Sequence, residues 1–97
     1  MVIISKTKIN DFIRVHVDAE ESLMKWYITS KQANWRNFAG LKQIFRTADS
    51  VGNDLYVFNI KGNRYRLIVR IIFGARTIFI KFIGTHAEYD KIDMTKL

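Results

Sequence analysis

The stretch from Leu55 to Ala87 constrains the fold of this chain more than any other. Its thirty-three residues contain six basic side chains and no acidic one. Three runs rich in β-branched and aromatic residues follow one another, joined by the short connections Gly62-Asn63 and Gly74-Ala75. A Gly-Asn pair between two such runs is a strong hairpin signal, because both turn positions tolerate positive φ. The segment therefore predicts three consecutive antiparallel strands.

Two-residue loops also fix the register of the strands that they join. Around Gly62-Asn63 the predicted partners are Lys61 with Arg64, Ile60 with Tyr65, Asn59 with Arg66, and Phe58 with Leu67. Around Gly74-Ala75 they are Ile71 with Ile78, Arg70 with Phe79, Val69 with Ile80, Ile68 with Lys81, Leu67 with Phe82, and Arg64 with Thr85. The two turns independently predict one consistent sheet.

Side chains alternate between the faces of a strand, so this register sorts the residues into two sets. The set predicted to form the core is Tyr56, Phe58, Ile60, Tyr65, Leu67, Val69, Ile71, Phe73, Ile78, Ile80 and Phe82. The opposite set, here called the predicted cationic face, is Val57, Asn59, Lys61, Arg64, Arg66, Ile68, Arg70, Phe79, Lys81, Ile83 and Thr85.

The predicted cationic face has two interpretations. It is the ordinary solvated side of an antiparallel sheet, or it is a surface that binds phosphates and stacks bases. The absence of acidic partners in the segment favours the second interpretation, as do the aromatic and β-branched residues among the charges. We expect Asn59, Lys61, Asn63, Arg64 and Phe79 to contact RNA.

Composition limits the class of protein. A length of 97 residues predicts one domain over positions 1–97. The net charge of +7 favours a polyanionic partner, although charge alone does not separate RNA, DNA, an acidic protein and a membrane surface. The chain has no cysteine and no apolar run approaching the ~18 residues of a membrane span. We therefore expect a cytoplasmic protein that does not enter membranes.

The first half of the chain reads as helical. After a short strand at Val2-Ile3-Ile4, Ser5 or Thr7 is a candidate cap for a helix whose apolar stripe is Ile9, Phe12, Ile13 and His16. Asp18 and Glu21 have capping-box spacing before a second stripe of Leu23, Trp26, Tyr27 and Ser30. A third, shorter helix is predicted over Asn34 to Phe45, with Phe38, Leu41 and Phe45 inward.

A polar stretch from Thr47 to Asp54 is predicted to be a loop between the helices and the sheet. Helices followed by a run of antiparallel strands predict an α+β fold, with the short N-terminal strand and the helices packed on the apolar face of the sheet. At the other end, Thr85 and Glu88 have capping-box spacing, which predicts a short C-terminal helix through His86 to Asp90.

Several chemistries lack support in the sequence. His16 and His86 are the only histidines, and the carboxylates Glu88, Asp90 and Asp93 have no ligand cluster around them, so we expect neither a metal nor another cofactor. Phosphate-binding glycine loops and Ser-His-Asp arrangements are also absent.

Metal-free RNA cleavage needs only a proton acceptor, a proton donor and cations near the phosphate. Arg64, Arg66, Arg70 and Lys81 are candidate cations. His86 is the candidate for proton transfer, since histidine changes charge near neutral pH. A lone histidine after a strand is more often a cap or a surface residue, and Tyr89 is either a core-edge aromatic or a neighbouring proton-transfer or stacking group.

These residues also carry a family resemblance. The run Tyr56 to Ile68, with Asn59-Ile60-Lys61-Gly62-Asn63 and Arg66-Leu67, is followed by Phe82 to Ile92, with Thr85-His86-Ala87-Glu88-Tyr89-Asp90. This pattern resembles the HigB branch of the RelE-like toxins of bacterial type II toxin–antitoxin systems. Trp35 to Phe45 resembles the family's region before the loop, so the likeness covers most of the chain and is strongest over its last forty residues.

The resemblance implies a compact RelE-like fold and a metal-independent, ribosome-dependent mRNA endonuclease that inhibits translation. It implies a HigA-type helix-turn-helix antitoxin as partner, and contact with operator DNA only through the toxin–antitoxin complex. By carry-over, the matched catalytic positions are Arg66, His86 and Tyr89, while Arg70 and Lys81 join them from the face argument. Trp26 and Trp35 are interpreted as core or antitoxin-facing groups.

Two other function classes remain open on the sequence. A non-catalytic RNA-binding or ribosome-binding module would use the same basic face without a proton-transfer group, so only His86 and Tyr89 separate it from an enzyme. A protein whose basic face docks an acidic partner is the third class, and it is compatible with either of the others because an antitoxin is such a partner.

Overall fold

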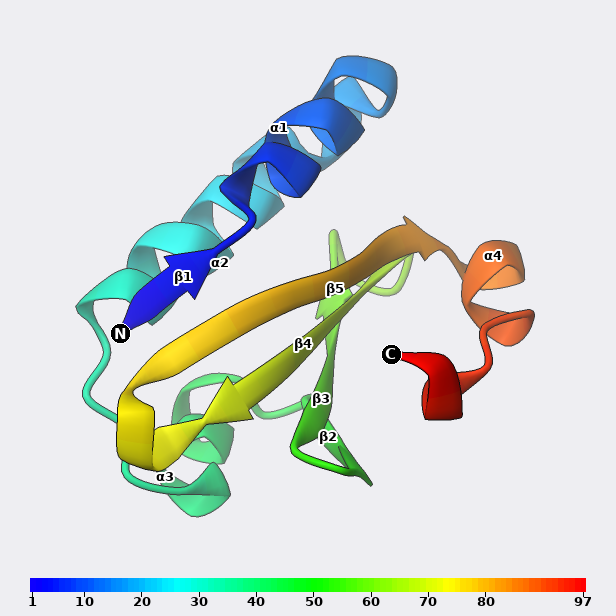
Figure 1. Cartoon of the computed structure of the whole chain (residues 1–97). Coiled ribbons are helices and arrows are strands. Elements are labelled where there is room, and N and C mark those ends of the chain that lie inside the picture. The colour runs from blue at the N-terminus through cyan, green and yellow to red at the C-terminus, as the bar shows by residue number, and fades with distance from the viewer.

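A computed structural model describes residues 1–97. Five strands form one sheet in the order β1-β5-β4-β3-β2, with helices on both sides (Figure 1). In chain order the elements are β1 (Val2–Ile4), α1 (Lys6–Val15), the 3-10 helix η1 (Val17–Ala19), α2 (Glu20–Gln32), α3 (Phe38–Ile44), β2 (Asp49–Gly52), β3 (Leu55–Ile60), β4 (Tyr65–Ile72), η2 (Phe73–Ala75), β5 (Thr77–Thr85), α4 (His86–Asp90) and η3 (Met94–Lys96). The predicted α+β class is confirmed.

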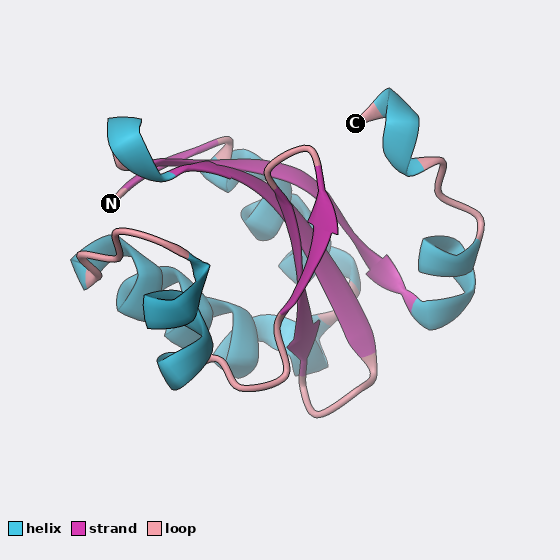
Figure 2. Ribbon diagram, turned by 90° about the horizontal axis from the view of Figure 1, so that it is seen from below, coloured by secondary structure: helices cyan, strands magenta, loops and turns pink.

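The main core lies between the sheet and the helices α1 to α3. Leu23 and Trp26 of α2 and Leu41 of α3 are buried there against strand residues such as Phe58 and Leu67. Figure 2 shows these helices on one side of the sheet, while α4 and η3 lie on the other. The helical stripes predicted from the sequence therefore face the sheet, and both tryptophans belong to the core.

Several details of the helical half differ from expectation. Ser5 stands at the N-cap of α1 but its side chain makes no capping hydrogen bond. The capping box predicted at Asp18 and Glu21 is wrong, because α2 begins after Ala19 and the Asp18 carboxylate bonds elsewhere. The third helix is shorter than predicted and begins at Phe38, where the Asn37 side chain accepts a hydrogen bond from the Gly40 N–H at 3.1 Å.

The sheet has two strands at its edges that the turn pattern did not predict. Asp49–Gly52, expected to be loop, forms β2 and pairs antiparallel with β3. The predicted strand at Val2–Ile4 pairs parallel with Thr77–Phe79 of β5, so the sheet is mixed. β2 is short, fully exposed and composed of polar and turn-forming residues apart from Val51, so strand propensity does not identify it, whereas β1 is apolar and was predicted.

The hairpin of β3 and β4 has the predicted register, with Ile60 opposite Tyr65 and Asn59 opposite Arg66. The Arg64 N–H donates to the Lys61 carbonyl at 3.2 Å, as expected for a two-residue loop. Left-handed φ falls on Lys61 and Gly62, at 52° and 66°, and Asn63 is free of it. The position of the turn is therefore as predicted, but the two residues with positive φ are Lys61 and Gly62 instead of Gly62 and Asn63.

The second connection keeps its predicted register only near the turn. Ile71 pairs with Ile78, Arg70 with Phe79 and Val69 with Ile80, but the register then shifts and Ile68 pairs with Phe82. Lys81 is the residue left over, as in a β-bulge. The predicted pairs of Ile68 with Lys81, Leu67 with Phe82 and Arg64 with Thr85 are therefore wrong. Leu67 pairs with Ile83 and Tyr65 with Thr85 instead.

The bulge exchanges two side chains between the faces of the sheet. Ile83, expected on the cationic face, packs against the main core, while Phe82, expected in the core, joins a second apolar cluster. That cluster centres on Leu55, Val57 and Ile68. The chain after β5 covers it through Tyr89, Ile92, Met94 and Leu97. The face predicted to be open is therefore partly covered, which decides where a site can lie.

Candidate active site

Helix α4 is fixed to the end of β5 by a complete capping box. Thr85 Oγ1 accepts a hydrogen bond from the Glu88 N–H at 3.3 Å, and Glu88 Oε1 accepts one from the Thr85 N–H at 2.9 Å. The predicted capping box is confirmed. It starts the helix at His86 and places His86 and Tyr89, three residues apart, on the same side of α4.

Four side chains from three elements meet at this end of the sheet. Arg66 of β4 donates from Nε to His86 Nε2 at 3.3 Å, and its guanidinium carbon lies 5.0 Å from the centre of the Tyr89 ring. Asn63, from the β3–β4 turn, places Oδ1 3.0 Å from the same His86 nitrogen. These four residues are here called the Arg66 cluster. They include all three positions carried over from the family pattern.

Gly84 makes room for this arrangement. It is opposite Arg66 in the sheet and is buried. A Cβ atom at this position would overlap the ring of Phe82, which lies across it. Phe82 reaches this face only because of the bulge at Lys81, so the bulge and the glycine together shape the floor beside Arg66.

The two contacts at His86 Nε2 correspond to two tautomers of the imidazole ring. The Arg66 Nε–H is always a donor, so its bond needs an unprotonated Nε2. The Asn63 oxygen is an acceptor, so its bond needs a proton on Nε2. One nitrogen cannot satisfy both at once. The partner of His86 Nε2 therefore depends on which ring nitrogen carries the proton: an unprotonated Nε2 fits Arg66, and an Nε2–H fits Asn63.

Arg70 lies on the same strand but outside this cluster. Four residues along a strand correspond to about 13 Å, and the buried Ile68 lies between the two arginines. The Arg70 guanidinium donates to the main-chain oxygens of Asn53 at 3.2 Å and Leu97 at 3.0 Å. Its hydrogen bonds hold the β2–β3 turn and the end of the chain against the sheet.

Arg64 faces the helical side instead of the cationic face. It forms an ion pair with Asp18 at 2.8 Å, and Tyr65 donates to the other Asp18 oxygen at 2.6 Å. The hydrogen bond from Tyr65, and to a smaller extent that from Arg64, holds the pKa of Asp18 below its usual range. The bond to Asp18 also raises the pKa of Tyr65. The expected place of Arg64 on the cationic face is therefore wrong.

The other predicted RNA contacts are dispersed. Lys61 and Asn63 are exposed at the β3–β4 turn, and Asn59 is half-buried on β3. Phe79 is half-buried beside Arg70, and Lys81 Nζ lies 6.0 Å from the centre of its ring. The structure thus brings Asn63 to His86 and leaves Phe79 and Lys81 toward the Arg70 end of the sheet.

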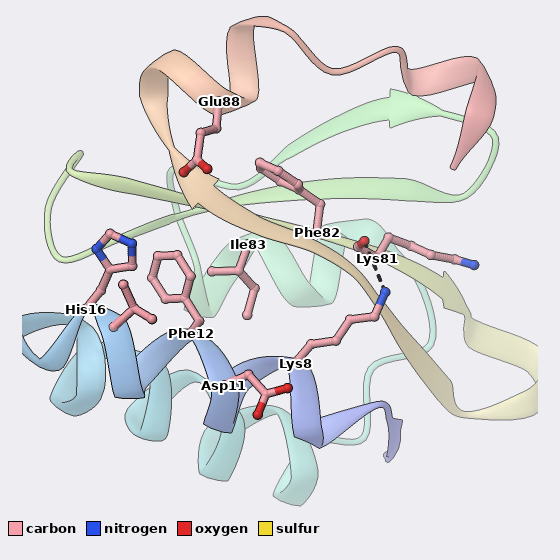
Figure 3. Close-up of a pocket in the computed structure, with 9 residues that line it drawn as sticks. Lys8, Asp11, Phe12, His16, Lys81, Phe82, Ile83 and Glu88 are labelled. Carbon is pink, nitrogen blue, oxygen red and sulfur yellow. Dashed lines mark hydrogen bonds between the residues drawn. The ribbon is translucent and has the colours of Figure 1, made fainter.

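A groove of about 450 Å³ lies between α1 and the outer edge of β5. Figure 3 shows Lys8, Asp11 and Phe12 of α1, with His16 just after the helix, facing Phe82 and Ile83, and Glu88 of α4 at one end. Lys8 Nζ donates to the carbonyl of the bulged Lys81 at 3.5 Å. The His16 ring stacks on Phe12 at 4.3 Å. Sequence reasoning did not identify this groove, because the free edge of β5 depends on where β1 stops pairing.

Glu88 links this groove to the Arg66 cluster through α4. The main-chain and side-chain hydrogen bonds of Thr85 lower the pKa of Glu88, and His16 contributes further through its charge. The acidic and histidine side chains do not gather in any group of three that would hold a metal ion. The acid–base groups at this end are therefore distributed singly, with His86 beside an arginine.

Comparison with known proteins identifies the family. Residues 19–92 match the model of the HigB toxin family, described as the RelE-like toxic component of a toxin–antitoxin system. The chain belongs to this family. The matched segment contains the whole Arg66 cluster, and the resemblance inferred from the turn and from the Thr85 to Asp90 pattern is confirmed.

Two relatives from Escherichia coli illustrate the distance within the HigB family. The mRNA interferase HigB of strain O6:H1 is 31% identical over 94 residues, which cover 95% of this chain and 91% of that protein. The mRNA interferase toxin HigB of strain K12 is 25% identical over 92 residues, covering 93% and 88%. As a toxic component, this chain has an antitoxin as partner, and none of its helices has the length and apolar character needed to cross a membrane.

Proposed function

We propose that this HigB-family chain is a metal-independent endoribonuclease that cuts mRNA on the ribosome and so inhibits translation. The observation that carries the proposal is the hydrogen bond from Arg66 Nε to His86 Nε2. It joins a cation suited to phosphate with a side chain suited to proton transfer. The name mRNA interferase on its relatives supports the same activity.

The proposed reaction is attack of a ribose 2′-oxygen on the neighbouring phosphorus. His86 Nε2 takes the 2′-hydroxyl proton as the new P–O bond forms, and the bond to the 5′-oxygen breaks. The products are a 2′,3′-cyclic phosphate and a 5′-hydroxyl, whose proton comes from Tyr89 or from water. Because the protonated Nε2 turns to Asn63, Arg66 becomes free as negative charge develops on the phosphate. Asn63 is thus a positioning residue for His86.

The ribosome supplies the geometry that the small site lacks. The Arg66 cluster contains one arginine and one histidine, with Asn63 and Tyr89 beside them. Holding the mRNA in an in-line geometry on the ribosome contributes much of the rate that acid–base groups alone do not provide. We therefore propose strict dependence on translating ribosomes, with Lys61 and Asn59 contacting the RNA near the turn, and we place the action in the cytoplasm.

The partner proposed for this toxin is a HigA-type antitoxin with a helix-turn-helix domain. The net charge of +7 favours association with an acidic partner surface. Contact with operator DNA is proposed to occur only through the toxin–antitoxin complex, because the antitoxin contributes the DNA-reading helix.

The test is expression of the chain alone, followed by growth measurement and mapping of mRNA 5′ ends. Arg66→Ala and His86→Ala are compared with Arg36→Ala, whose side chain is exposed in the connection between α2 and α3. New 5′ ends and growth arrest that persist in the Arg36 variant and vanish in the other two support the nuclease. Growth arrest without new ends, unchanged in the His86 variant, would favour a non-catalytic RNA-binding or ribosome-binding module.

A further inference from the structure

A second groove lies on the helical side of the molecule, between α2 and α3. It consists of two adjoining concavities of about 320 and 300 Å³ that share Thr29 and Ile44 as lining residues. One concavity extends to Lys61 and Gly62 at the β3–β4 turn, and the other extends to Trp35. We call the two together the α2–α3 groove.

The lining of the α2–α3 groove is apolar at its centre and basic at one end. Ile44 separates the two halves and leaves 58% of its surface exposed, and the half-buried Phe45 lies beside it. Lys25 and Lys61 line the half nearer the turn, and no acidic residue lines either half. The occupant that complements this surface has aliphatic side chains flanked by carboxylates.

Two unsatisfied features border the same half of the groove. The pairing of β2 with β3 ends at Val57, so Phe58–Ile60 have no strand partner on that side. Trp26 is buried, and its indole N–H has no acceptor within the chain. An extended polypeptide segment fits the unpaired edge of β3 at Phe58–Ile60.

An RNA strand fits the groove less well than a protein segment. Bases stack on exposed aromatic rings and arginine planes, whereas the exposed centre here is the aliphatic Ile44 and both neighbouring tryptophans are buried. The cationic Arg66 cluster, which the proposed function assigns to RNA, is built from the end of β4, the turn and α4. The groove adjoins the cluster at the turn, where it shares Asn59 and Lys61 with the RNA surface proposed above, so an occupant there also competes with RNA for these two residues.

We propose that the α2–α3 groove binds an acidic, amphipathic segment of the antitoxin. This inference rests on the proposed function only for the identity of the partner. The bound segment places one apolar side chain on each side of Ile44 and carboxylates beside Lys25 and Lys61. It lies next to Asn63, the neighbour of Gly62 in the turn, so it neutralises the toxin from the side of the turn and leaves the Arg66 cluster unfilled.

The first experiment replaces Ile44 with glutamate and uses Ile28→Glu as its matched control. Ile28 is 51% exposed on α2 and lines neither half of the groove, so both variants introduce the same charge at a comparably exposed position. Binding of the antitoxin encoded beside this toxin is measured by titration calorimetry. We expect Ile44→Glu to weaken binding by at least about thirtyfold and Ile28→Glu by less than about threefold.

Growth assays on the same variants separate this inference from the proposed function. We expect Ile44→Glu to arrest growth as the unchanged chain does, but to resist rescue by the antitoxin. Equal binding and equal rescue of the two variants would overturn the groove proposal, even if the toxin proves to be a nuclease. Loss of growth arrest without loss of binding would also count against it, because it would place Ile44 in the toxic activity.

A second variant tests the charge of the occupant. Lys25→Glu should weaken antitoxin binding about tenfold at low salt and by much less at high salt, since the contact lies at the rim of the groove. An affinity that is independent of salt in both the unchanged chain and this variant would exclude an acidic occupant.

Discussion

Arg66 and Arg70 stand on the same strand and the same face of the sheet, and their surroundings differ completely. Arg66 contacts a histidine and an aromatic ring of α4 at one end of the sheet. Arg70 donates to two main-chain oxygens and closes the other end. Sequence periodicity treats the two arginines alike, so the comparison teaches that the tertiary structure decides which partners a basic residue on one face of a sheet has.

The largest effect on mRNA cleavage is expected from alanine substitution of Arg66, with Arg70 as its comparison. Arg66→Ala should reduce cleavage on the ribosome by about 100-fold to 1000-fold, because it removes the cation at the developing charge. Arg70→Ala should leave the rate within about threefold and lower the free energy of unfolding by about 1–3 kcal/mol through its lost hydrogen bonds. Cleavage rates and urea unfolding of both variants make the test. The reverse pattern would move the active site to the Arg70 end.

The second largest effect on cleavage is expected at His86, and His16 is its control. His86→Gln keeps a polar side chain but removes proton transfer, and it should slow cleavage about 100-fold while ribosome binding stays unchanged. His16→Gln, in the groove beside α1, should cut at nearly the normal rate, because the His16 ring stacks on Phe12 and meets the Tyr65 ring edge-on, outside the Arg66 cluster. Single-turnover rates and ribosome cosedimentation report the two steps separately. Normal cleavage by the His86 variant would remove it from the mechanism.

A smaller effect is expected at Asn63. Asn63→Ala should slow cleavage about tenfold, because the protonated His86 loses its acceptor and Arg66 is released less readily. Nitrogen chemical shifts of the His86 ring should then report more of the form with an unprotonated Nε2 bonded to Arg66. Asn63→Asp keeps an acceptor oxygen and should restore the protonated form. Unchanged ring shifts in both variants would show that Asn63 does not position His86.

The smallest expected effect concerns stability and lies outside the site. In the folded protein the hydrogen bonds from Tyr65 and Arg64 lower the pKa of Asp18 below its ordinary value of 3.8. These bonds therefore stabilise the fold fully at pH values above 3.8. The stabilisation is lost as the pH falls through the lowered pKa. Asp18→Asn should therefore lower the melting temperature at pH 7. It should also reduce the difference between the melting temperatures measured at pH 7 and at pH 3. Equal pH dependence of the two proteins would contradict this assignment.

Local chemistry made part of the fold predictable from the sequence. The Gly62-Asn63 turn fixed the pairing from Ile60 and Tyr65 outward, because a two-residue loop leaves one register. The capping box of Thr85 and Glu88 fixed the start of α4, and so placed His86 and Tyr89 together. Each of these features depends on residues within a few positions of one another, so no distant partner alters it.

Long-range pairing made the remaining features unpredictable. A bulge adds one residue to one strand only, and the residues near Lys81 do not predict it. Because of the bulge, Phe82 and Ile83 each lie on the face of the sheet opposite to the predicted one. Asp18 has the spacing of a cap but binds Arg64 and Tyr65, because these side chains offer stronger, charge-assisted bonds than its own helix.

The sequence by itself determined the hairpin, the apolar stripes of the helices, the capped C-terminal helix and the basic character of the sheet. The tertiary structure alone decided which basic residue is free. The physical reason is that folding places hydrogen-bond acceptors within about 3 Å of an arginine, and these acceptors occupy its N–H groups. For Arg70 these are the main-chain oxygens of Asn53 and Leu97, and for Arg66 the acceptor is one ring nitrogen of His86, bonded to Nε.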